Sequence, residues 1–330
     1  MFRSSWSHVV KRTLASPRQV DRRPRSHRPL CEELDRRLQP SSFAFSTGAP
    51  DGKVATISEP ANAHNSNVEY ESADDFVLSK ETVINNVSFT GLLTGGATPK
   101  DVSNVVVEIY RVFPLDSNTA RTPMVPTRVN SPSDVAFRSL DSADKGLNFR
   151  TEVLNKNFTA LASVSSAAKI SVNSGGNGPV TGEEVEFDVD FGKHPLDLPA
   201  GHYFFVPQVG LSDKAPAGAD FLWLSAPKPI VPPGTPFPPG ATDLQSWMRD
   251  DPPLAPDWLR IGTDIIKQGA PPTFTTYNAS FELHGQTVEQ RGDDHALDSV
   301  AKGLLDVLPS LAERQLGESG HPQGRSLPRP

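Results

Sequence analysis

Hydrophobic and polar positions alternate with a period of two along most of the chain after Phe45. Short runs of branched and aromatic residues are divided by Gly, Pro, Asn and Asp, which is typical of β-strands joined by turns. In the clearest run, EEVEFDVDF, acidic residues alternate with Val185, Phe187 and Val189. One side of this strand is apolar and the other acidic, so it predicts an antiparallel sheet covered on one face only.

The same pattern predicts about ten strands. The clearest span residues 74–78, 82–92, 102–113, 147–154, 183–191, 201–211, 220–226, 257–264 and 278–285. No helical pattern separates these runs, so the sequence predicts an all-β fold, an antiparallel β-sandwich of the jelly-roll type. A Gly-rich segment at 173–184 lies between two strand-like runs and predicts a hairpin loop. It lacks the following helix and the Lys-Ser/Thr ending of a phosphate-binding loop.

The two ends of the chain differ from its middle. Residues 1–45 predict a disordered basic arm, because their composition cannot bury a core. An organelle-targeting segment, or an artefact of the chosen start site, would have the same composition. Residues 46–288 form the predicted sandwich domain. Within 289–330, Leu297, Val300 and Leu304 follow helical spacing and predict one short amphipathic helix before a polar tail.

The net charge of −7 is unevenly distributed. The first 40 residues carry nine Arg and one Lys against four acids, so the remaining 290 residues carry −13. An acidic body repels a phosphate backbone, and we expect no nucleic-acid partner. No apolar run approaches the ~18 residues of a membrane span. The single cysteine, Cys31, allows no internal disulfide.

Residues 221–264 hold three of the four tryptophans and ten of the 32 prolines. Aromatic faces beside carboxylates and guanidinium groups suit sugars, which present apolar C–H surfaces and hydroxyl groups. The segment therefore predicts a carbohydrate-binding loop tip formed by Trp247, Arg249, Asp250, Asp251 and Trp258. The alternative interpretation is that the tryptophans belong to the core, with Trp247 pinning a proline-stiffened connector.

Clustered carboxylates suggest a second site. Asp74 and Asp75 are weak candidate ligands for Ca²⁺, which prefers oxygen donors. The alternative is turn chemistry before a strand, because the chain has no twelve-residue Ca²⁺ loop. No residue pattern marks a nucleophile, a zinc site or a catalytic pair.

Residues 72–92, SADDFVLSKETVINNVSFTGL, resemble the opening stretch of many uncharacterised exported bacterial β-sandwich proteins. In these proteins, Ala-Asp-Asp-Phe begins a strand and a second strand ends in aromatic-x-Gly. DLPAGHYFFVPQV, at 197–209, is similar to a later Leu-x-Ala-Gly-x-Tyr strand of the same proteins. The resemblance covers about residues 70–284. It implies the fold and an extracellular or cell-surface location, and it supplies no catalytic residues.

These observations lead to one expectation and two alternatives. We expect a non-catalytic extracellular or surface module that binds a glycan or another extracellular ligand. The first alternative is a polysaccharide hydrolase that uses paired carboxylates, with Asp250 or Asp251 among them. The second is a purely structural protein without a ligand. Since neither an export signal nor a surface anchor is visible, an organelle or the cytoplasm is the alternative location.

Overall fold

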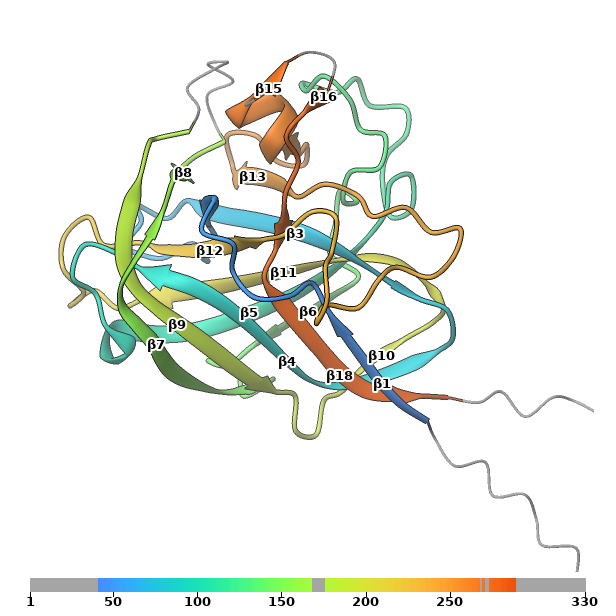
Figure 1. Ribbon diagram of the computed structural model, residues 1–330, viewed down its shortest axis with the longest axis horizontal. Helices are drawn as coiled ribbons and strands as arrows, with labels where there is room; N and C mark the ends of the chain where they lie inside the picture. Colours follow the sequence, from blue (N-terminus) through green and yellow to red (C-terminus); the bar gives the residue numbers. More distant parts are fainter. Residues whose placement is uncertain (1–40, 168–175, 268, 271–272, 289–330) are drawn as a thin grey trace, which may run out of the picture. The chain divides into compact units, whose positions relative to one another are not determined.

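The computed structural model describes residues 41–167, 176–267, 269–270 and 273–288 (Figure 1). Two largely antiparallel sheets make up this part of the chain, which confirms the predicted all-β sandwich. The basic arm up to residue 40, residues 173–175 of the Gly-rich segment and the predicted C-terminal helix lie outside the described residues. Among the residues described, no helix has the length and apolar character needed to cross a membrane.

The first sheet has ten strands, and β4 is its central member because it pairs with β18, β12, β9 and β10. All pairings are antiparallel except that of β2 with β8. The strands are β1 (Ser41–Ser46), β2 (Val54–Ile57), β4 (Thr82–Leu93), β7 (Asn148–Ala160), β8 (Ala162–Val164), β9 (Val180–Asp190), β10 (Leu196–Leu198), β12 (Phe221–Ala226), β17 (Asn278–Ala279) and β18 (Phe281–Thr287).

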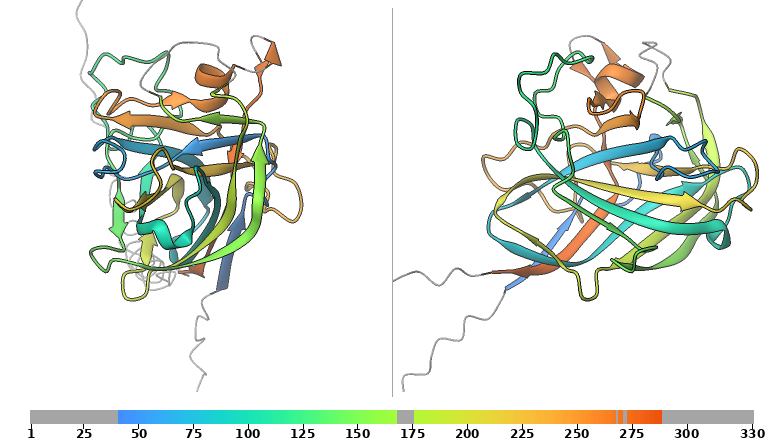
Figure 2. Two further views of the ribbon diagram at one scale, coloured as in Figure 1. Left: turned by 90° about the vertical axis from the view of Figure 1, so that its left-hand side faces the viewer. Right: turned by 180° about the vertical axis from the view of Figure 1, so that it is seen from behind.

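The second sheet has six strands in the order β14-β13-β3-β11-β5-β6. Its strands come forward when the molecule is turned by 180° (Figure 2). They are β3 (Glu69–Leu78), β5 (Val102–Arg111), β6 (Arg138–Asp141), β11 (Gly201–Leu211), β13 (Trp247–Asp251) and β14 (Leu259–Arg260). A separate hairpin joins β15 (Gly269–Ala270) to β16 (Thr273–Phe274), and the helical turns are η1 (Pro99–Asp101) and η2 (Ile261–Ile266).

The main core lies between the inner faces of the two sheets. Alternate residues of β4, β9, β12 and β18 meet alternate residues of β3, β5 and β11, as period-two strands require. Phe281 packs against Phe205 with ring centroids 5.1 Å apart, and Trp223 donates its indole N–H to the Ser280 carbonyl at 2.9 Å. On β9, Asp188 and Asp190 are exposed, which confirms the predicted acidic outer side.

The outer face of the second sheet is also covered, unlike the outer side of β9. Nearly every residue of β11 is buried, whichever face of the sheet its side chain lies on. The cover consists of residues 112–136, hereafter the covering loop, together with the segment around Trp258. Trp258 donates its indole N–H to the Ser133 carbonyl of the covering loop at 3.2 Å. Its ring meets the edge of Tyr110 on β5 at 5.3 Å.

Three local predictions are corrected by the structure. The sheet begins at Ser41, so the last residues of the predicted arm belong to β1, which pairs with β18. Of the strand predicted at 257–264, only Leu259–Arg260 is extended. The chain then turns into η2, because Asp264 accepts hydrogen bonds from the Arg260 backbone N–H and guanidinium at 2.7–2.9 Å. Residues 247–251 form β13 instead of a loop tip.

Glu59 is a fully buried carboxyl group at the end of the core. Its Oε1 accepts a hydrogen bond from the Phe221 backbone N–H at 2.7 Å, and its Oε2 accepts one from the Asn65 side chain at 3.3 Å. Burial raises the pKa of Glu59 from 4.5 to about 7, with Asp220 adding repulsion and His64 opposing it. The folded protein therefore binds the Glu59 proton more tightly than the unfolded chain does.

A raised carboxyl pKa makes folding more favourable at low pH. The contribution of Glu59 is complete below pH 4.5 and is lost as pH rises through about 7. At ~1.4 kcal/mol per pKa unit, this amounts to at most about 3.5 kcal/mol. We expect Glu59→Gln to lack this loss between pH 5 and pH 8 in urea unfolding. Glu282→Gln, at an exposed position, should keep the wild-type pH dependence; an unchanged pH profile in Glu59→Gln would contradict the assignment.

Candidate functional site

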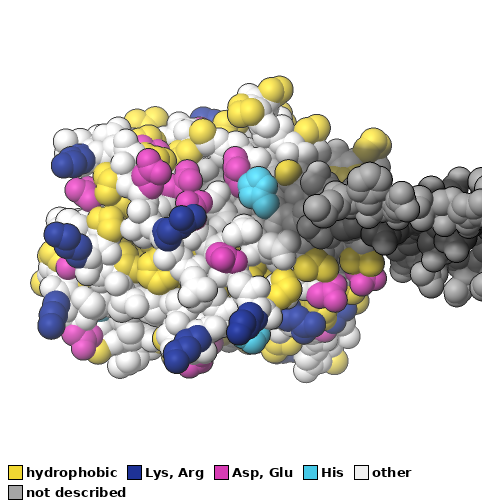
Figure 3. Space-filling view, turned by 90° about the horizontal axis from the view of Figure 1, so that it is seen from below, with side chains coloured by type: hydrophobic (Ala, Val, Ile, Leu, Met, Phe, Trp, Pro, Cys, Tyr) yellow, Lys and Arg dark blue, Asp and Glu magenta, His cyan; other side chains and the backbone are white. Residues whose placement is uncertain are grey.

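Charged side chains of both signs are interspersed on the face of the molecule seen in Figure 3, without a large patch of one sign. Such a surface offers no strong field of one sign to a charged partner. A different arrangement occurs on the outer face of the second sheet, where several charged groups are buried under the covering loop. Buried charges are costly unless they are paired, so this face is the first candidate for a functional site.

The register of β13 on β3 decides which side chains share this face. Trp247 lies opposite Ala73, Arg249 opposite Glu71, and Asp251 opposite Glu69. Since side chains of a strand alternate between faces, these residues of β13 lie on the outer side and Met248 and Asp250 on the inner side. Two of the predicted ligand-binding residues, Arg249 and Asp251, therefore lie beside acidic residues of β3.

Arg249 and Glu71 form a buried ion pair. The guanidinium Nη2 donates to Glu71 Oε1 at 2.9 Å, and its Nε donates to Glu71 Oε2. Nη2 also donates to the Tyr110 hydroxyl at 2.8 Å, and the guanidinium carbon lies 4.4 Å from the ring centre of Trp258. Burial disfavours the charged form, but the Glu71 carboxylate outweighs it and raises the pKa of Arg249. Arg249 is thus a fixed internal cation.

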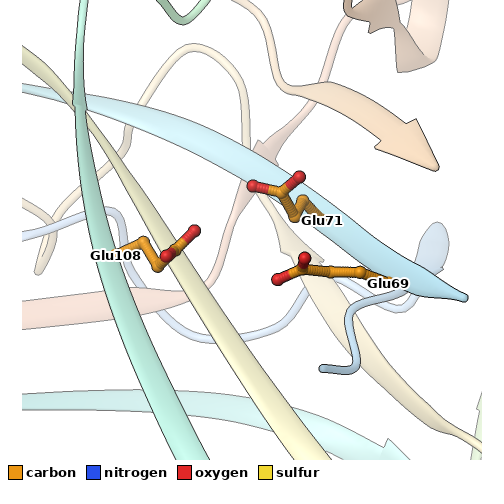
Figure 4. Close-up of side chains that lie close together, drawn as sticks. All are labelled: Glu69, Glu71 and Glu108. Carbon is orange, nitrogen blue, oxygen red and sulfur yellow. The ribbon is translucent and has the colours of Figure 1, made fainter. Parts of the chain in front are cut away.

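Three carboxyl groups converge beside this pair. Glu69 and Glu71 extend from β3 and Glu108 extends from β5, and they point toward one another across β11 (Figure 4). One oxygen from each lies within 4.8 Å of the others. Glu71 is fully buried, whereas Glu69 and Glu108 are half-buried and reach solvent.

Tyr110 links the acids through a single hydroxyl group. Its oxygen lies 2.7 Å from Glu71 Oε1 and 2.8 Å from Glu108 Oε2. The Tyr110 hydroxyl has one proton and can donate it to only one of the two carboxylates. The contact with Glu108 becomes favourable when Glu108 is protonated and donates to the hydroxyl oxygen. Burial raises the pKa of Glu108 to about 7, and repulsion from Glu71 adds to it. Burial likewise raises the pKa of Glu69.

Gln208 on β11 contributes an amide to the same cluster. Its side chain is fully buried, and its Nε2 donates to Glu69 Oε1 at 2.8 Å. Its Oε1 has no hydrogen-bond partner among the residues that the structure describes. The amide that is bonded to one of the three acids therefore has a buried oxygen without a hydrogen-bond partner in the described part of the chain.

Trp247 forms part of a cleft next to this cluster. The cleft has a volume of about 240 Å³ and is lined by Thr127, Val129, Asn130, Leu244, Gln245, Trp247 and Arg260. Trp247 is only 1% exposed, and its indole N–H finds no acceptor within the described part of the chain. Val129, on the covering loop, is 67% exposed. Apolar walls with a few polar groups are typical of small-ligand sites.

The structure does not bring the five predicted ligand-binding residues into one exposed platform. Trp258 is 1% exposed and packs against Arg249, so it presents no ring to solvent. Asp250 lies on the other side of β13, where its carboxylate accepts hydrogen bonds from Ser166 Oγ at 2.5 Å and the Ala167 N–H at 2.9 Å. Of the five predicted residues, only Trp247 lines the cleft.

The two predicted calcium ligands point in different directions. Asp74 accepts hydrogen bonds from Ser246 Oγ at 3.0 Å and the Ala279 N–H at 2.8 Å. Its neighbour Asp75 accepts one from His202 Nε2 at 2.5 Å and one from the Leu244 N–H at 3.2 Å. Adjacent strand residues face opposite sides, so the two carboxylates do not form one ligand set.

Sequence reasoning missed the acids of β3 and β5. The signal was present as Glu-x-Glu at 69–71 and as one Glu in the apolar run VVVEIYRVF. An acid in the middle of a strand that is otherwise hydrophobic indicates either an exposed face or a buried functional group. The pattern alone does not distinguish these, because the covering loop comes from a separate part of the chain.

Comparison of the chain with protein-family models, with curated proteins and with solved structures finds no match. The function must therefore be argued from the geometry of this chain alone.

The ion pair gives a direct test of how the site is held together. Removing one partner leaves a buried charge uncompensated, so we expect Arg249→Met and Glu71→Gln each to lower the free energy of unfolding by about 3–5 kcal/mol. The double variant should lose clearly less than the sum, with a coupling of ~1–3 kcal/mol. Urea unfolding of the four proteins measures this coupling. Additive losses would show that the two side chains do not act as a pair.

Proposed function

We propose that the protein is a non-catalytic binding module that takes a small saccharide in the cleft beside Trp247. The observation that carries the proposal is Trp247, a residue that lines the cleft and whose buried indole N–H has no acceptor among the described residues. A buried donor without a partner costs free energy, which a ligand hydroxyl that accepts its hydrogen bond would recover.

The lining of the cleft supports a sugar as the ligand. Val129 and Leu244 provide apolar surface for C–H groups, and the side chains of Asn130, Gln245 and Thr127 provide hydrogen-bonding groups. Arg260 lies at the edge with its guanidinium held by Asp264 at 2.7 Å. A volume of about 240 Å³ is below the ~300–1,000 Å³ of pockets for drug-sized ligands, which favours one or two sugar rings.

The polysaccharide hydrolase is the less supported alternative. Asp250, one of the two acids predicted for it, is buried against Ser166 and Ala167. The carboxyl pair with contrasting environments is Glu71 and Glu108, which resembles an acid–base pair in its chemistry. However, Glu71 is fully buried and ion-paired with Arg249, so a glycosidic bond has no route between the two groups. The site therefore favours binding over hydrolysis.

The test is saccharide binding to the purified full chain, first on a glycan array and then by calorimetry. Trp247→Phe keeps the ring and removes only the N–H, so we expect affinity for the selected saccharide to fall about 5–10-fold, equivalent to one hydrogen bond of ~1 kcal/mol. Asn130→Gly removes the side-chain amide at a position whose φ of 63° glycine readily adopts, and should also weaken binding.

The matched control is Trp223→Phe. It removes an indole N–H that is bonded to Ser280 in the core between the two sheets, and Trp223 does not line the cleft, so this change should leave saccharide affinity unchanged. Two results would contradict the proposal: no saccharide bound by the wild-type chain, or equal affinity in the wild type and Trp247→Phe. Release of reducing sugar from a polysaccharide panel would instead favour the hydrolase.

A further inference from the structure

We propose that Glu69, Glu108 and Gln208, together with Glu71, form a binding site for one Ca²⁺ ion on the outer face of the second sheet. The site is separate from the predicted Asp74 and Asp75 ligands and from the saccharide cleft, and it does not depend on the proposed saccharide.

The donor set is made entirely of oxygen atoms. One carboxylate oxygen from each of Glu69, Glu71 and Glu108 lies within 4.8 Å of the others, and the Gln208 amide is bonded to Glu69. Ca²⁺ binds carboxylate and amide oxygens at about 2.3–2.6 Å, so two ligands on opposite sides of the ion are up to ~5 Å apart. The spacing of the three acids therefore suits an ion shared among them.

Charge gives a second, independent argument. When Glu69, Glu71 and Glu108 are ionised, Arg249 compensates only one of the three negative charges, which leaves two. Asp251 lies opposite Glu69 on β13 and adds a further acid nearby. A divalent cation neutralises this excess without removing the Arg249–Glu71 pair. Repulsion among carboxylates in a partly buried site is otherwise unfavourable.

The buried oxygen of Gln208 points to a ligand. It is fully shielded from solvent and has no partner among the described residues, while the nitrogen of the same amide is bonded to a member of the acid cluster. Buried polar atoms in native proteins almost always have a partner. A 180° rotation of the Gln208 side-chain amide exchanges its oxygen and nitrogen, which would bring the oxygen to the position beside Glu69 and next to a cation held by the acids.

Access and geometry favour Ca²⁺ over Mg²⁺. Glu69 and Glu108 are only half-buried, which gives the ion a path from solvent and leaves coordination positions for water. The ligands come from three adjacent strands, β3, β11 and β5, and extend from the same face of the sheet. Mg²⁺ requires near-ideal octahedral geometry, whereas Ca²⁺ accepts irregular sets of six to eight oxygens.

Calorimetric titration of the chelator-treated full chain with CaCl₂ tests the proposal. We expect one Ca²⁺ per chain and a Tm that rises by about 5–10 °C at 100-fold excess over Kd. Glu69→Gln and Glu108→Gln should each weaken Ca²⁺ binding at least 10-fold. Glu152→Gln makes the same change at an exposed position on β7 and should bind as the wild type does. MgCl₂ should bind more weakly than CaCl₂.

A probe on the wild-type chain keeps the test informative if a variant does not fold. Tb³⁺ replaces Ca²⁺ and emits when a nearby aromatic ring is excited, and Tyr110 contacts Glu108 directly. We expect sensitised Tb³⁺ emission that CaCl₂ abolishes. The proposal is overturned if the wild type binds no Ca²⁺ up to ~10 mM, well above the weakest Ca²⁺ sites. Wild-type affinity in folded Glu69→Gln and Glu108→Gln, or Tb³⁺ emission that CaCl₂ leaves unchanged, overturns it equally.

Discussion

The buried ion pair between Arg249 and Glu71 is the interaction on which the outer face of the second sheet depends. It joins β13 to β3, and the same guanidinium contacts Tyr110 of β5 and the ring of Trp258. Burying either charge without its partner costs free energy, so each charged residue is stable there only when the strand that carries its partner is in place. The pair thereby fixes the register that places Trp247 in the cleft and Asp251 opposite Glu69.

The covering loop explains why this face differs from the other side of the sandwich. On β9 the outer side is exposed, and its acids, such as Asp188, are solvated. On β3 and β5 the outer side is covered, so acids of the same type are partly or fully buried and must be matched by Arg249, Tyr110 or a bound cation. The covering loop, the charge pairing and the two proposed binding sites therefore belong to the same face of the second sheet. The saccharide cleft and the cation site lie at neighbouring positions along β13 and β3.

The sequence predicted the strands well where period-two alternation reflects one buried face, as at 82–92 and 183–191. It predicted an extended run at 257–264 wrongly, because Asp264 binds Arg260 locally and the chain turns there. At the site, Trp247 and Arg249 were singled out, but their partners Glu71, Glu108 and Gln208 were not. Those contacts join positions far apart in the chain, and their pairing depends on strand register, which a single sequence does not specify.

The Arg249–Glu71 pair holds β13 against β3 and, through Trp258, holds the covering loop on the outer face of the second sheet. Hydrogen exchange of the full chain, compared between the wild type and Arg249→Met, measures this directly because exchange reports local opening. We expect faster exchange in β13, in residues 112–136 and around Trp258, with β7 and β9 unchanged. Faster exchange spread evenly over both sheets, or no change at β13, would contradict it.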